Sequence, residues 1–198
     1  MKSLIIRVAI CLGLALVSGC VLKEPYPRDW EAINTVPGSC PDISGIFSDK
    51  GQLDPAEIKD GLGNQYWEVS LSRHIFRKQE NIGSASHVEI IQKRVDEIKV
   101  IAWQGSKLVI EQMFTKTDKD LTCQSGFIEV VGEQTCEAGT GVMACETPEI
   151  RLSKNTKGEL IMRWNSRGFG MVYLIPATVS EWHWYRFEPL KLDQGGSN

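Results

Sequence analysis

Short runs of β-branched and aromatic residues, separated by glycine, asparagine and proline, follow one another along this chain from residue 40 onward. Such runs are typical of β-strands, and turn residues every 8 to 12 or so positions are typical of all-β sandwiches and barrels. The clearest pair is 95–103 and 108–114, joined by a short turn. In the first of these runs, Ile98, Val100 and Ala102 occupy alternate positions, so they share one face of the predicted strand.

The remaining runs extend the same pattern to the end of the chain. Further strands are predicted at 44–48, 66–76, 87–92, 121–131, 149–152, 159–164, 169–175 and 182–187, with the last four separated by turns at 155–158, 165–168 and 176–180. Asp54 followed by Pro55 resembles the start of a helix, with the aspartate as N-cap. The sequence therefore predicts a single antiparallel β-sandwich or small β-barrel of about ten strands, with at most one short helix near 55–60.

Four cysteines lie in this β-rich region, at Cys40, Cys123, Cys136 and Cys145. An even number of cysteines in an exported chain predicts a disulfide framework, and four cysteines allow three pairings. Local closure of a glycine-rich loop favours Cys136 with Cys145, which leaves Cys40 to pair with Cys123. The cysteines lack the close Cys-x₂₋₄-Cys spacing of structural zinc sites, so no metal site is expected.

The first nineteen residues have the order of a secretory signal peptide. Lys2 and Arg7 supply a charged start, an apolar run follows at 8–17, and small residues precede Cys20. A membrane-spanning helix needs roughly 20 apolar residues, so this run is too short to be a permanent anchor.

The segment Leu16-Val17-Ser18-Gly19-Cys20 resembles the lipobox of bacterial lipoproteins. The resemblance implies cleavage between Gly19 and Cys20, a diacylglycerol on the Cys20 sulfur and a further acyl chain on the new amino terminus. Apart from these acyl groups, we expect no cofactor. More than one acyl chain gives stable attachment to a bilayer. Residue 21 is Val rather than Asp, which in this family implies the outer membrane, periplasmic side, rather than the inner membrane.

The chain is thus expected to contain a signal peptide at 1–19, a lipidated cysteine with a flexible tether at 20–39, and one β-rich domain at 40–198. Trp30, within the expected tether, has two alternatives, which are the lipid interface and docking onto the domain. The net charge is −3 and no block of Lys or Arg occurs, so no nucleic-acid partner is expected.

No catalytic constellation stands out in the sequence. No Gly-x-Ser-x-Gly elbow occurs, and the nearest approach, at 83–87, is predicted to be a polar loop leading into a strand. His74, His87 and His183 are widely spaced and do not follow a metal-ligand pattern. We therefore expect no catalytic residues and a protein that is not an enzyme.

The aromatic segment at 182–187 is the most unusual feature of the mature chain. On a strand, Trp182, Trp184 and Arg186 share one face, which either packs in the core or forms a binding face, with core packing favoured. Gly45-Ile46-Phe47 together with the late Arg186 is similar to the lipocalin pattern, in which a late arginine packs on an early aromatic residue. That resemblance implies a barrel whose interior carries an apolar ligand.

Together these features favour a membrane-anchored cell-envelope lipoprotein whose β-domain acts by binding or scaffolding. Its expected partners are membrane lipid, through the acyl anchor, and an envelope protein. The first alternative is a lipocalin-like barrel that carries an apolar ligand. The second is a hydrolase of envelope polymers.

Overall fold

The computed structural model describes residues 25–34, 39–54, 69–76, 85–118, 121–132, 134–139, 142–172 and 175–191. Within these ranges the chain forms twelve strands and one short helix, which confirms the predicted all-β class. The helix is α2 (Leu71–Ile75), and the strands are β1 (Gly45–Ser48), β2 (Lys50–Leu53), β3 (Val69–Ser70), β4 (His87–Arg94), β5 (Glu97–Gln104), β6 (Lys107–Thr115), β7 (Leu121–Gln124), β8 (Phe127–Val131), β9 (Thr135–Gly139), β10 (Val142–Lys154), β11 (Leu160–Val172) and β12 (Ile175–Phe187).

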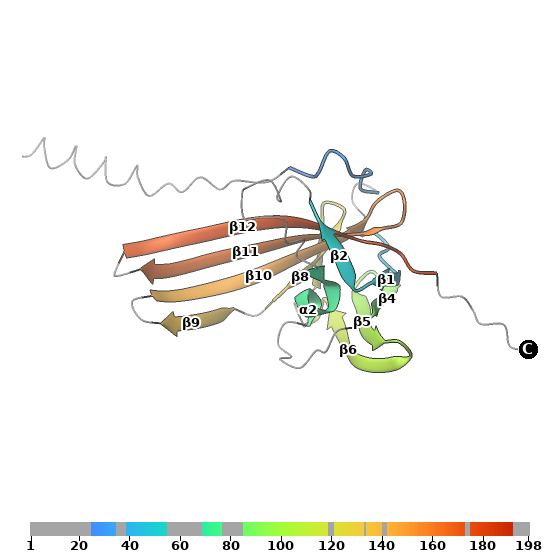
Figure 1. Ribbon diagram of the computed structural model, residues 1–198, viewed down its shortest axis with the longest axis horizontal. Helices are drawn as coiled ribbons and strands as arrows, with labels where there is room; N and C mark the ends of the chain where they lie inside the picture. Colours follow the sequence, from blue (N-terminus) through green and yellow to red (C-terminus); the bar gives the residue numbers. More distant parts are fainter. Residues whose placement is uncertain are drawn as a thin grey trace, which may run out of the picture.

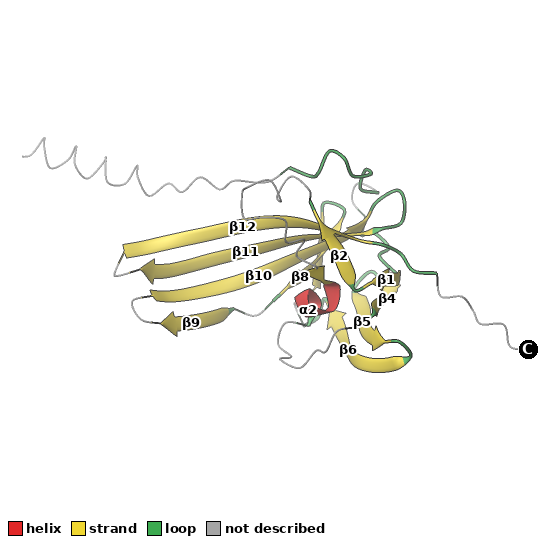
Figure 2. Cartoon of the chain, in the orientation of Figure 1, coloured by secondary structure: helices red, strands yellow, loops and turns green. Residues whose placement is uncertain are grey.

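The strands form two antiparallel sheets (Figure 1). One sheet has the order β1-β4-β5-β6. The other has eight strands in the order β3-β2-β12-β11-β10-β8-β7, with β9 paired to β10. Coloured by secondary structure, the body is almost entirely strand, with α2 as the single red helix (Figure 2). The arrangement is a β-sandwich, one of the two predicted alternatives.

The core lies between the two sheets and follows from the two-residue period of their strands. Ile98, Val100 and Ala102 on β5 are buried together, as the alternation predicts. From the eight-stranded sheet, Leu160 and Met162 enter the same cluster. The long strands of both sheets therefore turn one face toward the core, with the alternating residues on the opposite face.

One predicted strand, at 121–131, is wrong because a tight turn divides it into β7 and β8. Ser125 and Gly126 both adopt positive φ, at 53° and 78°. Consecutive residues with positive φ are typical of the two-residue turns that join hairpin strands. Ser153 Oγ donates a hydrogen bond to the Gly126 carbonyl and so ties this turn to β10.

The predicted strand at 66–76 is also different in the structure. Its described part contains the two-residue β3 and then α2. The Ser70 side chain caps the helix by accepting a hydrogen bond from the Arg73 N–H. Asp49 accepts a further hydrogen bond from the Ser72 N–H. These polar groups stabilise a helical turn within the segment for which the sequence predicts a strand.

The last three strands are longer than the sequence predicts, with 13 residues each. The turn predicted at 155–158 is confirmed, and Gly158 has a φ of +81° there. The turns predicted at 165–168 and 176–180 are wrong, because both segments lie inside paired strands. Turn-type residues remain extended here because neighbouring strands satisfy their backbone hydrogen bonds.

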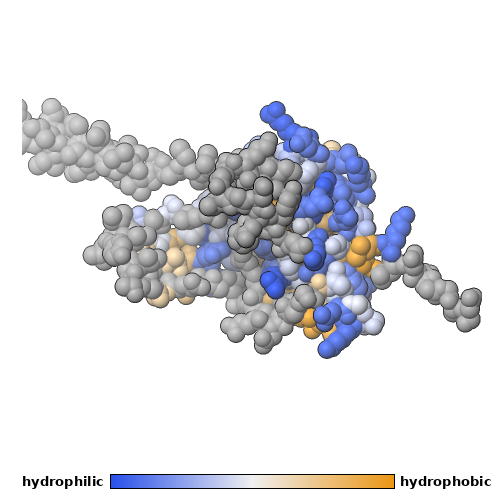
Figure 3. All heavy atoms as spheres, in the orientation of Figure 1, coloured by the Kyte–Doolittle hydropathy of each residue, from blue (hydrophilic) through white to orange (hydrophobic). Residues whose placement is uncertain are grey.

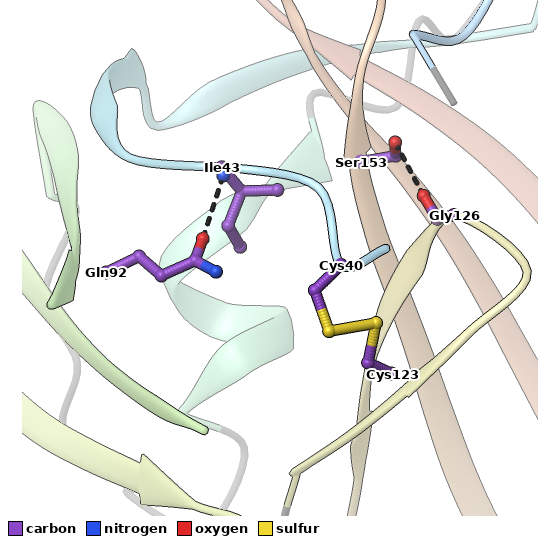
Figure 4. The surroundings of a disulfide bond; sticks show 6 residues. All are labelled: Cys40, Ile43, Gln92, Cys123, Gly126 and Ser153. Atoms are coloured by element: carbon purple, nitrogen blue, oxygen red, sulfur yellow. Dashed lines mark hydrogen bonds between the residues drawn. A yellow bond between two sulfur atoms is a disulfide. The ribbon is translucent and has the colours of Figure 1, made fainter. Parts of the chain in front are cut away.

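Both preferred disulfides are present. Cys40 pairs with Cys123, and Cys136 pairs with Cys145. The first joins the segment before β1 to β7, close to the point where the Ile43 N–H donates to the Gln92 side chain (Figure 4). The second lies within a hairpin, since Cys136 on β9 is directly opposite Cys145 on β10. The glycine-rich loop predicted between these cysteines is therefore wrong, and this segment is largely paired strand.

Residues 25–34, which we call the N-terminal strap, pack on the eight-stranded sheet. The Asn34 N–H donates to the Lys154 carbonyl at 2.8 Å, and the Thr156 N–H donates to the Ala32 carbonyl at 3.0 Å. Trp30 is only 7% exposed, so it docks onto the domain. Part of the segment predicted to be a flexible tether is therefore folded.

Several predictions lie outside the described residues. They include the signal peptide at 1–19, the cleavage and acylation site at Gly19 and Cys20, and the helix near 55–60. Among the residues that are described, no helix is long and apolar enough to cross a membrane.

Candidate functional site

The eight-stranded sheet has a second face, opposite the core, which we call the back face. It is built from the residues that alternate with core positions such as Met162 and Tyr185. On β11 and β12 these residues are Ile161, Arg163, Asn165, Arg167, Trp182, Trp184 and Arg186. A face that carries three arginines and two tryptophans differs from the apolar core face, so it is the candidate site of the domain.

The N-terminal strap covers one end of the back face with aromatic side chains. The Tyr26 ring meets the Trp184 ring edge-on at 5.1 Å and the Trp30 ring at 6.1 Å. The Arg186 guanidinium lies 5.3 Å from the Trp30 ring centre. Burial raises the pKa of Tyr26 to about 12, and the nearby Glu159 adds to the rise. This end of the face is a second, smaller core.

The predicted binding face of Trp182, Trp184 and Arg186 can now be placed. The three residues share the back face, as their alternation predicts. Both tryptophans are buried, and Arg186 donates a hydrogen bond to the Gln52 side chain. Strap contacts cover Trp184 and Arg186, so any ligand site on this face centres nearer to Trp182.

The structure places Phe47 and Arg186, the two residues of the lipocalin resemblance, differently from the lipocalin pattern. Phe47 is buried in the core between the sheets. Arg186 lies on the back face and contacts Trp30 rather than the core cluster. The two residues are therefore on opposite sides of the sheet.

Arg163 is the most unusual side chain on the back face. It is 7% exposed, and its guanidinium carbon lies 3.7 Å from the Trp182 ring centre and 5.2 Å from that of Trp184. Its Nε and Nη2 atoms are buried and have no hydrogen-bond partner among the described residues. Burial, followed by the charge of Arg151, lowers the pKa of Arg163 from its ordinary value.

Asn165 and Trp182 extend this polar cluster. They face one another across β11 and β12, and Asn165 is 0% exposed. Both polar atoms of the Asn165 amide and the Trp182 indole N–H are buried without a partner in the part of the chain that the structure describes. An unpaired buried polar group costs about 1–3 kcal/mol. We call Arg163, Asn165 and Trp182 the back-face polar cluster.

Charged residues next to the cluster are paired with one another. Arg151 contacts Glu149 at 2.7 Å and Glu129 at 3.3 Å, and Arg167 contacts Glu149 at 3.6 Å. With Arg163 included, three arginines meet two glutamates, and Arg163 has no ion pair within the described ranges. The cluster therefore carries one excess positive charge in a shielded position.

The outer parts of β10, β11 and β12, together with β9, extend beyond the body of the sandwich (Figure 1). We call residues 135–139, 142–148, 166–172 and 175–180 the arm. Phe169 on the arm is 58% exposed and lies opposite Cys145 and Thr178. Apolar residues are visible on the described surface of the arm, whereas hydrophilic residues dominate the visible body (Figure 3).

On one side of the arm, β12 is an edge strand with a largely unpaired outer side among the described residues. β12 pairs with β11 along its whole length, but on its other side β2 pairs only with Tyr185 and Arg186. In the described chain, residues 175–183 therefore present backbone groups without a neighbouring strand on that side. Pro176 lies within this edge, a position where the missing N–H is tolerated.

Ser86 and His87 come closest to a catalytic pair. Ser86 Oγ lies 2.9 Å from His87 Nδ1. The same oxygen donates to the Trp103 carbonyl at 3.1 Å and accepts from the Gly105 N–H at 2.9 Å. These bonds hold Ser86 against the β5–β6 turn. They account for its position without a catalytic role. No group of three metal-ligating side chains occurs in the described segments.

No family model, curated protein or solved structure matches the chain. The candidate site therefore depends on its geometry alone. The sequence predicts Trp182 on a binding face. It assigns no role to Arg163, which lies in the predicted strand at 159–164, or to Asn165, which falls in the predicted turn at 165–168. The available signal was the alternation of Arg163 and Asn165 with Met162 and Trp164.

Proposed function

We propose that this protein is a lipid-anchored component of the bacterial cell envelope that acts by binding another envelope protein through its arm. The lipobox-like segment ending at Cys20 supports the anchor, and Val21 supports the periplasmic side of the outer membrane. The β-domain then acts as a binding module rather than an enzyme.

The observation that carries the proposal is the length of β10, β11 and β12. Strands of 13 residues extend roughly 44 Å, whereas the 8 or 9 residues of β4, β5 and β6 in the facing sheet extend roughly 30 Å. The arm is the part of the large sheet that extends beyond the body (Figure 1). A sheet usually buries at least one face, so a projecting arm is suited to burying a face against a partner.

The chemistry of the arm suits a protein partner. Its β12 edge offers a row of backbone donors and acceptors, which another chain can extend as an added strand. Phe169, exposed beside the Cys136–Cys145 disulfide, offers an apolar anchor next to that edge. The disulfide joins adjacent strands and limits the conformational freedom that the arm would lose on binding.

A photo-crosslinking experiment in intact cells tests the proposal. A photoreactive phenylalanine analogue replaces Phe169 on the arm, and in a matched control it replaces Val95, which is 61% exposed on the β4–β5 turn. We expect a discrete crosslinked protein product from position 169 and none from position 95. The same product from both positions, or none from position 169, contradicts the proposal.

A further inference from the structure

The back-face polar cluster carries an inference of its own, independent of the arm. We infer that Arg163, Asn165 and Trp182 form a binding site for a carboxylate that adjoins an amide, as at the carboxyl terminus of a peptide. The carboxylate of such a ligand matches Arg163, and its amide matches Asn165.

The carboxylate follows from the geometry of Arg163. Its Nε and Nη2 atoms form one edge of the guanidinium, and both lack a partner among the described residues. This edge presents two parallel N–H groups, which match the two oxygens of a carboxylate. The Trp182 ring lies 3.7 Å from the guanidinium carbon and offers no hydrogen-bond acceptor to this edge, which is left for a ligand.

The amide follows from Asn165. Its side chain offers a donor and an acceptor, both buried and without a partner in the described chain. In an extended peptide the N–H and the C=O of one residue point to the same side, so the residue before the carboxyl-terminal one offers Asn165 both a donor and an acceptor. The Trp182 indole N–H supplies one further donor to the same ligand.

Local charge favours an anionic ligand, because the nearby carboxylates of the protein are paired with other arginines. The two nearby acids, Glu129 and Glu149, already pair with Arg151 and Arg167. Burial lowers the pKa of Arg163, and a bound carboxylate opposes this effect by favouring the charged guanidinium. Because the polar atoms are shielded, entry requires local opening, and we expect association slower than about 10⁵ M⁻¹s⁻¹.

Calorimetric titration of the full acylated chain in detergent micelles tests the inference. The probes are N-acetyl-alanyl-alanine, the same dipeptide with a carboxyl-terminal amide, and inorganic phosphate. We expect the free acid to bind and the amide to bind at least about a hundredfold more weakly, since it lacks the second oxygen and the charge. We expect phosphate to displace the acid only at concentrations well above that of the acid, since phosphate can pair with Arg163 but lacks the peptide chain that reaches Asn165.

Two variants and a matched control locate the site. Arg163→Lys keeps the charge but loses the paired N–H edge, so we expect at least about tenfold weaker binding of the acid. Asn165→Asp places a carboxylate beside the ligand and should weaken binding similarly. Arg94→Lys, on the other sheet and 69% exposed at its side chain, makes the same chemical change away from the site and should bind as the parent does.

The inference is overturned if the acid does not bind at about 10 mM, if acid and amide bind equally, if phosphate displaces the acid at an equal concentration, or if both site variants bind normally. Circular dichroism checks the fold of each variant. If Arg163→Lys does not fold, the comparison of the free acid with its amide on the parent chain still tests whether the site recognises a carboxylate. Crosslinking at Phe169 does not depend on this result, so the two proposals can fail separately.

Discussion

Tyr26 links the packing of the N-terminal strap to pH. Its hydroxyl donates to the Glu31 carbonyl at 2.6 Å, and burial raises its pKa from 10.0 to about 12. The folded state therefore favours the neutral phenol. The stabilisation is fully present below pH 10.0, the ordinary pKa, and is lost as the pH rises through about 12.

Tyr26→Phe tests this link. Below pH 10.0 we expect the variant to be less stable than the parent by about 1 kcal/mol, because one hydrogen bond to a carbonyl is lost. The difference should shrink as the pH rises toward 12, since only the parent titrates at this position. Urea unfolding of both proteins, followed by tryptophan fluorescence, measures it, and a difference that does not change with pH contradicts the interpretation.

Single residues also show why the candidate site was only partly predictable. Trp182 was recognised because aromatic residues at alternate positions indicate a shared face. Arg163 and Asn165 are polar residues inside an apolar run, and their burial depends on packing against a strand almost twenty positions later. Alternation with Met162 and Trp164 is a local signal that Arg163 and Asn165 share a face, but nothing local indicates that this face is buried.

At the level of elements, strand positions were more predictable than strand lengths. The β5–β6 hairpin follows from alternation and from a glycine at its turn, where Gly105 has a φ of +60°. Residues 165–168 and 176–180 have turn-type composition but lie within long strands. Local composition indicates the intrinsic preference of a segment for strand or turn, whereas the length of a strand depends on the neighbour with which it pairs.

The two disulfides should contribute differently to stability. Cys40 and Cys123 are separated by 83 residues, and Cys136 and Cys145 by 9. Loop-closure entropy then gives about 4.6 kcal/mol for the first and about 2.7 kcal/mol for the second. We expect the Cys40→Ala/Cys123→Ala variant to lose more unfolding free energy in urea than Cys136→Ala/Cys145→Ala, and the opposite order contradicts this account.

At the scale of the whole molecule, the proposed anchor and the fold should be separable. Cys20→Ser removes the acylated sulfur and should release the protein from membranes, while the thermal unfolding midpoint of the domain stays the same. Cys11→Ser, within the predicted signal peptide, is the matched control and should remain membrane-bound. Cell fractionation with intact mass measurement checks both, and a parent protein that carries no fatty acid contradicts the proposal.

The docked strap also limits how far the domain can stand from the bilayer. The N-terminal strap at 25–34 is packed on the domain, so with the lipid proposed on Cys20 only a few residues separate the acyl chains from folded protein. Five residues extend at most about 18 Å. With the proposed anchor, the domain would be restricted in height and tilt, and it would meet a partner in a thin layer at the membrane surface.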